Sequence, residues 1–158
     1  PEVIEIRKKV LGQGYNEKLI SGDMFQLHWI QKIDTTLPTL ISAAGVYQYF
    51  HESEIIEMIQ KMKAQIPYGE LVFDATNSKG LRFANKYVKK TGNDNAQMHF
   101  SVDDPGEFAR RTCTELIEVD GFFRSALKEC HGLRRTTRIT MYFADRWKRT
   151  LVLHFVFQ

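Results

Sequence analysis

Two kinds of hydrophobic pattern alternate over the first two thirds of the chain. Segments with apolar residues three and four positions apart predict amphipathic helices, and short continuous apolar runs predict buried strands. The pattern predicts helices at residues 1–11, 24–33, 51–66 and 81–90. It predicts strands at residues 18–21, 39–44 and 70–74.

In the last third of the chain the same patterns are shorter. They predict helices at 105–113 and 137–148 and strands at 115–119 and 150–157, with little chain at the end for a crossover helix. Alternating strands and helices are typical of an α/β fold with a mostly parallel sheet that is covered on both faces. The two late strands fit an antiparallel edge pair, and the absence of repeats and of low-complexity segments indicates a single domain.

Composition limits the function classes. With 158 residues, 43% of them hydrophobic, the chain can bury a core, and no apolar stretch approaches the ~20 residues that cross a bilayer. The net charge is only +3, and the basic clusters at 86–90 and 146–149 are short, so we expect solvated helix faces and no nucleic-acid partner. Two cysteines are too few for a disulfide framework, which fits a reducing, cytoplasmic setting.

Ligands of open α/β sheets bind beyond the carboxyl ends of the strands, so the candidate site lies at the strand ends. At the first end, Asp23 precedes two large apolar residues, Met24 and Phe25. The Asp23 carboxylate can accept a hydrogen bond from an exocyclic amine while Met24 or Phe25 covers a flat ring, which suits adenine. Asp23 can also cap the next helix, and the two roles are compatible.

The second strand end is made of small residues, Ala43, Ala44 and Gly45. Small residues let a ligand approach the backbone closely, or they allow tight packing of the strand against a helix. Two tyrosines follow, Tyr47 and Tyr49, which either line a pocket or pack beneath the next helix.

At the third strand end, Asp74 can reach a substrate or cofactor group, or it can form a turn. His51 and His99 are candidates for a general base, with ordinary surface histidines as the alternative, so we assign no catalytic base. The five histidines have no metal-ligand spacing, and the sequence contains neither a P-loop nor a nucleophile elbow, so we expect no metal site.

Four blocks support a family resemblance: "PEVIEIRKKVL", "LISGDMFQLHWIQKI", "LPTLISAAGVYQYFHESEIIEMIQKM" and "YGELVFDATNSKG". In this order and spacing they resemble the leucine carboxyl methyltransferase superfamily, and more closely its bacterial branch of tetracenomycin-type polyketide O-methyltransferases. The match covers about residues 1–80, and "MYFADRWKR" with "LVLHF" is similar to the carboxyl end of that branch.

This resemblance implies a class I S-adenosylmethionine-dependent methyltransferase, whose Rossmann-like sheet has the strand order 3-2-1-4-5-7-6. It implies an O-methyltransferase that acts on a small-molecule hydroxyl, phenol or carboxylate, such as a polyketide-like acceptor. The implied cofactor contacts are Asp23, Met24 and Phe25 for adenine, and Ala43, Ala44 and Gly45 for the methionine part. Tyr47, Tyr49 and Asp74 are the candidate substrate contacts, on their positions at the strand ends and not on the resemblance.

Two features depart from the family pattern. Ala44 stands where the carboxyl methyltransferases have a glutamate. The glycine-rich loop after strand 1 and the acid after strand 2 would both precede Pro1, so we expect residues 1–158 to be the carboxyl-terminal portion of one methyltransferase domain that lacks strands 1 and 2. Such a chain would bind the cofactor weakly, and its exposed sheet edge would favour a homodimer.

Two other functions compete with this hypothesis. One is a noncatalytic α/β module for binding or dimerisation, which the expected lack of the glycine-rich loop favours. The other is a nucleotide-binding α/β domain with different chemistry, to which Asp23 would be equally useful. The sequence identifies neither the methyl acceptor nor the oligomeric state.

Overall fold

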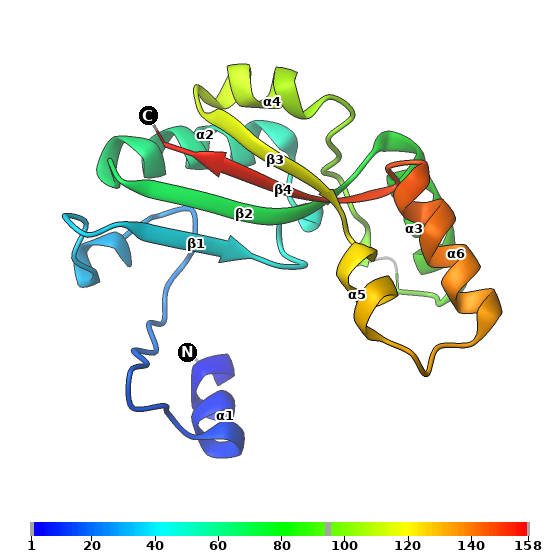
Figure 1. The fold of residues 1–158 in the computed structure, drawn as a ribbon. Coiled ribbons are helices and arrows are strands. Elements are labelled where there is room, and N and C mark those ends of the chain that lie inside the picture. Colours follow the sequence, from blue (N-terminus) through cyan, green and yellow to red (C-terminus); the bar gives the residue numbers. More distant parts are fainter. Residues whose placement is uncertain (1, 94–95, 158) are drawn as a thin grey trace.

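The computed structural model describes residues 2–93 and 96–157, so the predicted role of Pro1 in starting the first helix lies outside the described residues. The strands are β1 (Thr39–Ala43), β2 (Gly69–Thr76), β3 (Glu115–Gly121) and β4 (Thr150–Val156). They form a single sheet in the order β1-β2-β4-β3 (Figure 1). β1 and β2 are parallel, and β4 runs antiparallel to both β2 and β3.

The α/β fold is therefore confirmed, although the sheet is more mixed than predicted. Three strands point the same way, but β4 is inserted between two of them, so only the β1–β2 pairing is parallel. All four strands lie within two residues of their predicted bounds. The order matches the segment 4-5-7-6 of the order that the resemblance implied.

Helices form around this sheet where the sequence has a period of 3.6, and one short helix was not predicted. The helices are α1 (Glu2–Leu11), α2 (Glu52–Gln65), α3 (Ser78–Lys90), α4 (Pro105–Thr112), α5 (Arg124–Glu129) and α6 (Arg135–Arg146), with 3-10 turns at η1 (Ile30–Lys32) and η2 (Tyr47–Tyr49). Figure 1 shows α1 apart from the sheet, joined to it by an extended segment. The ion pair between Arg7 and Glu17, at 2.5 Å, holds α1 against that segment.

Two predicted elements are wrong. Residues 18–21 form no strand, because a strand needs a backbone partner, and the free edge of β1 pairs with no other segment in the described chain. Residues 24–33 form turns and η1 instead of a helix. Leu27 has a φ of +56°, which ends any helix there, while Leu27 and Ile30 are both buried. Their spacing reflects burial in the core and not a helical period.

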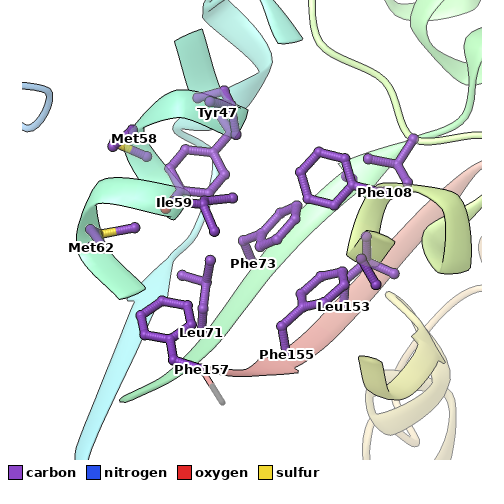
Figure 2. Close-up of a cluster of buried hydrophobic side chains, with 14 of the residues drawn as sticks. Tyr47, Met58, Ile59, Met62, Leu71, Phe73, Phe108, Leu153, Phe155 and Phe157 are labelled. Atoms are coloured by element: carbon purple, nitrogen blue, oxygen red, sulfur yellow. The ribbon is translucent and has the colours of Figure 1, made fainter. Parts of the chain in front are cut away.

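The core lies on one face of the sheet, beneath α2 and α4 (Figures 1 and 2). Phe73 of β2 stacks on Phe155 of β4, with ring centroids 5.6 Å apart and an angle of 14° between the planes. Tyr47 and Phe108 contact the same Phe73 ring from other sides. Buried aromatic pairs of this kind contribute about 0.5–1.5 kcal/mol beyond the area that they bury.

The other face of the sheet is only partly covered, which differs from the prediction of a sheet covered on both faces. Alternate residues of β2 and β4 are half-buried on that face, among them Val72, Asp74, Val152 and His154. Glu70 and His154 pair there at 2.7 Å. The mixture of valines with charged side chains keeps this face partly solvated in the described chain.

Candidate functional site

The carboxyl ends of β1, β2 and β3 lie together at one edge of the sheet, the carboxyl edge, which is distinct from the free lateral edge of β1. Because β4 is antiparallel, its amino end lies at the carboxyl edge too. This edge carries the turn after β1, the start of α3 and the turn that joins α6 to β4. The candidate residues were predicted to lie at these strand ends, and the structure shows which of them come together.

Gly45 and Asp74 are brought into direct contact. Gly45 has a φ of +67°, a left-handed conformation that glycine adopts without strain, and its N–H donates to Asp74 Oδ1 at 2.5 Å. A Cβ built on Gly45 would meet no atom within 4 Å. The turn therefore presents bare backbone to open space, and Asp74 holds it in that position.

The neighbours of Gly45 differ in exposure. Ala43 ends β1 and is half-buried against the core, whereas Ala44 is exposed. The small residues at this position thus leave room on the solvent side of the turn. Because Ala44 is exposed, its small side chain does not serve close packing against a helix.

Asp23, Met24 and Phe25 lie in a turn and not at a strand end. Asp23 is exposed, and its Oδ1 accepts a hydrogen bond from the Phe25 backbone N–H at 2.9 Å, so it caps a turn instead of a helix. Met24 and Phe25 are partly buried against the core. Phe25 packs edge-to-face on Phe50, with ring centroids 4.8 Å apart, which brings this segment beside the one that follows β1.

The two tyrosines after Gly45 have different environments. Tyr47 is only 3% exposed and packs on Phe73 with ring centroids 5.0 Å apart, as Figure 2 shows. Burial raises the pKa of the Tyr47 hydroxyl well above its ordinary value of 10, because the phenolate would lose its hydration. Tyr49 is 45% exposed. The Tyr47 ring thus belongs to the core, and Tyr49 faces solvent.

His51 and His99, which are far apart in the sequence, lie side by side with their ring planes tilted by 35°. Their ring centroids are 4.8 Å apart, and both residues are exposed. The His99 N–H donates to the Gln48 carbonyl at 2.7 Å, which holds the loop before Phe100 against η2. No sequence pattern indicates this pairing, because the two histidines belong to segments with no shared period.

The described residues contain no candidate metal site and no membrane-spanning helix, and their cysteines are unpaired. Among residues 2–93 and 96–157, no three His, Cys, Asp or Glu side chains come close enough together to hold a metal ion. Within the same residues no helix is both long enough and apolar enough to cross a membrane. Cys113 and Cys130 are free and exposed.

Two cavities open near the same edge of the sheet. One of about 550 Å³ lies between the end of β3, α5 and α6. The other, of about 500 Å³, lies between the start of α3 and the turn at Trp147 and Arg149. The sequence predicted neither cavity, and the first depends on α5, a helix of six residues that was not predicted.

Comparisons with known proteins support the methyltransferase resemblance. No family model matches the chain. It is 26% identical over 111 residues to the tetracenomycin polyketide synthesis O-methyltransferase TcmP of Streptomyces glaucescens, a match that covers 70% of this chain and 41% of TcmP. The chain therefore spans about two fifths of the length of that curated relative.

Two solved structures have a similar fold. A DUF574 family protein from Streptomyces avermitilis matches with a TM-score of 0.64 and 12% identity over 100% of this chain and 62% of that one. The magnesium protoporphyrin IX methyltransferase ChlM from Synechocystis PCC 6803, solved with bound SAH, matches with a TM-score of 0.51 and 14% identity over 99% of this chain and 58% of ChlM. Together these findings confirm the predicted resemblance to S-adenosylmethionine-dependent methyltransferases.

Proposed function

We propose that this chain is part of an S-adenosylmethionine-dependent O-methyltransferase that acts on a small-molecule hydroxyl, phenol or carboxylate. The observation that carries the proposal is the strand order β1-β2-β4-β3 with a reversed β4, found in a chain similar in sequence to a polyketide O-methyltransferase. The cytoplasm is the proposed location, and the two free, exposed cysteines fit a reducing compartment.

The turn after β1 is the proposed place for the methionine part of the cofactor. Gly45 fits this role, because its φ is positive and open space lies where a side chain would project. A backbone without a side chain lets a ligand approach closely. Asp74 positions this turn through the Gly45 N–H, so we propose a positioning role for Asp74 as well as its expected contact with substrate.

Asp23, Met24 and Phe25 are the proposed adenine contacts. The hydrogen bond to the Phe25 N–H uses only part of the capacity of the Asp23 carboxylate, which has about four lone-pair sites. The exposed carboxylate can therefore also accept from an exocyclic amine. Because Phe25 packs on Phe50, this segment lies on the same side of the molecule as the residues that follow Gly45.

Tyr49 is the proposed acceptor contact of the two tyrosines, since it is exposed and Tyr47 is held in the core. S-adenosylmethionine supplies the activated methyl group, and the protein contributes by holding the acceptor oxygen in line with it and by excluding water. We assign no catalytic base.

Chemical-shift mapping tests the cofactor site. We expect S-adenosylhomocysteine, added at millimolar concentration to the ¹⁵N-labelled chain, to perturb the amides of Ala44 and Gly45, with weak affinity because the chain spans only part of its relative. NAD and ATP are the ligand controls. Gly45→Val should abolish the perturbation, and Gly12→Val, at another glycine with positive φ and open surroundings, should leave it unchanged. The proposal fails if these amides do not respond, or if NAD or ATP perturbs them equally.

Transfer itself is tested with S-adenosylmethionine carrying a labelled methyl group and a panel of hydroxylated and carboxylated aromatic acceptors. We expect label in an ether or ester product, identified by mass spectrometry. Label in none of the acceptors, with the amides of Ala44 and Gly45 still perturbed by cofactor, would favour a noncatalytic binding module.

A dimerisation module is the second candidate, and the free edge of β1 is the observation that favours it. In the described chain β1 pairs with β2 alone, and Leu40 on this strand is 66% exposed. The Thr39 N–H bonds to the Tyr68 carbonyl and so points toward β2. Because the direction of the N–H alternates along a strand, the N–H of Ser42, three residues later, points to the free edge.

Sedimentation equilibrium decides whether this edge forms a homodimer. Ser42→Pro removes the outward N–H while leaving the β1–β2 ladder intact, because proline is tolerated at strand edges. A dimer that Ser42→Pro converts to monomer would support the module. A monomer at all concentrations would exclude it.

A further inference from the structure

The cavity between β3, α5 and α6 has the size and lining of a ligand site, and none of the residues proposed above to contact cofactor or acceptor lines it. Its volume of about 550 Å³ lies within the range of roughly 300–1,000 Å³ typical of small-molecule sites. A neighbouring cavity of about 320 Å³ shares two of its lining residues, Leu127 and Tyr142. The two cavities are therefore contiguous along α6.

The inner surface of the larger cavity is apolar. It is formed by side chains from four elements: Val119, Leu127, Tyr142 and Leu151. Leu151 is buried and Leu127 is half-buried, while Tyr142 presents an aromatic ring at the open side. A hydrophobic lining with one aromatic ring suits a flat apolar ligand.

The rim of the cavity carries more positive than negative charge. Its acids already have partners within the protein: Asp120 pairs with Arg124 at 2.7 Å, and Asp145 Oδ1 accepts from the Phe123 N–H at 3.1 Å. The cavity is also lined by three further cations, Lys128, Arg146 and Lys148. None of the three takes part in an ion pair with another described residue.

The backbone of Lys148 adds an independent observation. Lys148 follows the end of α6 with a φ of +51°, and the Arg149 N–H bonds to the Ala144 carbonyl while the Lys148 N–H bonds to the Asp145 carbonyl. This is the helix end at which glycine is strongly preferred, because other residues are strained there. A lysine kept in a strained position on a cavity rim points to a function for its charge.

We propose that this cavity binds a small aromatic carboxylate, with the rings on the apolar surface and the carboxylate against Lys148, Lys128 and Arg146. Binding at this cavity does not depend on the proposed methyl transfer. The ligand must have an apolar body, since a bare inorganic anion would leave the half-buried Leu127 and the exposed ring of Tyr142 in contact with water.

Calorimetric titration of the chain with anthracene-2-carboxylate tests the ligand class, and anthracene-2-carboxamide, of the same shape without the charge, is the matched control. Charge-assisted hydrogen bonds are about twice as strong as neutral ones, so we expect the carboxylate to bind at least about tenfold more tightly. Equal affinity for the two compounds, or binding by neither at millimolar concentration, would overturn the proposal. Phosphate alone should not compete.

Lys148→Gly separates function from structure. Relief of the left-handed strain should raise the melting temperature by ~2–4 °C, while loss of the ammonium group should weaken binding of anthracene-2-carboxylate by about fivefold or more. Lys128→Gln should weaken binding without raising the melting temperature. Arg135→Gln, which removes a charge from α6 away from the cavity, should change neither. Unaltered affinity in both lysine variants would refute the assignment.

Discussion

Replacement of Asp74 with alanine is expected to loosen the turn that follows β1. The Asp74 carboxylate accepts a hydrogen bond from the Gly45 N–H at 2.5 Å and so joins β2 to a residue beyond the end of β1. A hydrogen bond to a charged group contributes roughly 1.5–3 kcal/mol, and the half-buried position of Asp74 places the expected loss near the lower value. Asp74→Asn keeps an oxygen acceptor and should lose about half as much.

Gly45→Ala tests the same turn from the other side. Alanine at a φ of +67° costs about 1 kcal/mol, and a Cβ would meet no atom within 4 Å, so strain of the backbone is the whole cost. If Asp74 holds Gly45 in this conformation, the turn can relax in Asp74→Ala, and alanine at position 45 then costs less. The double variant should be destabilised by about 0.5 kcal/mol less than the sum of the single variants.

Urea unfolding of the wild type, both single variants and the double variant, followed by circular dichroism, gives the four free energies of unfolding. Equal dependence on urea concentration across the set would show that all four unfold to the same extent. Additive losses, or a loss in Asp74→Ala within the error of about 0.3 kcal/mol, would refute the view that Asp74 positions the turn.

Two further predictions concern other residues near the carboxyl edge of the sheet. Gly80→Ala should destabilise the fold by roughly 2 kcal/mol, although alanine favours helices, because its Cβ would clash with the Arg149 carbonyl. Gly106→Ala is the control and should be neutral, because the nearest atom to its Cβ is a side-chain oxygen at 3.3 Å. Equal urea midpoints for the two variants would contradict the clash at Gly80. The Arg124 guanidinium lowers the pKa of Asp120 below its ordinary 3.8, so this pair stabilises the fold above pH 3.8 and the contribution is lost as the pH falls through the lowered pKa. In Arg124→Gln, the Asp120 pKa measured by carboxyl NMR titration should rise; an unchanged value would contradict the pairing.

The strands were predictable because each carries its own local pattern. β1, β2 and β4 each contain a short apolar run, whereas in β3 the apolar residues are interrupted by Glu118, and these patterns place the bounds within two residues. The helix predicted at 24–33 is wrong because the apolar residues of this segment are buried in the core without a helical backbone. Spacing reports which side chains face the core, and only the positive φ of Leu27, which no sequence pattern indicates, shows that the backbone turns there.

The candidate site was predictable in its residues but not in its contacts. Gly45 and Asp74 were placed at strand ends by pattern alone, whereas their hydrogen bond depends on the register of β1 and β2. Tyr47 and Tyr49 are two positions apart on a single 3-10 turn, and only tertiary packing distinguishes the buried ring from the exposed one.

The reversal of β4 explains why the carboxyl edge of the sheet holds both candidate sites. Because β4 enters the sheet beside β2 in the antiparallel sense, its first residue pairs with Thr76, the last residue of β2. The turn that contains Lys148 must therefore lie at the edge where Gly45 and Asp74 also lie. β2 separates β1 from β4, so the strained turn and the Gly45 turn are anchored to different strands. It follows that Lys148→Gly should affect the cavity while leaving the hydrogen bond between Gly45 and Asp74 intact.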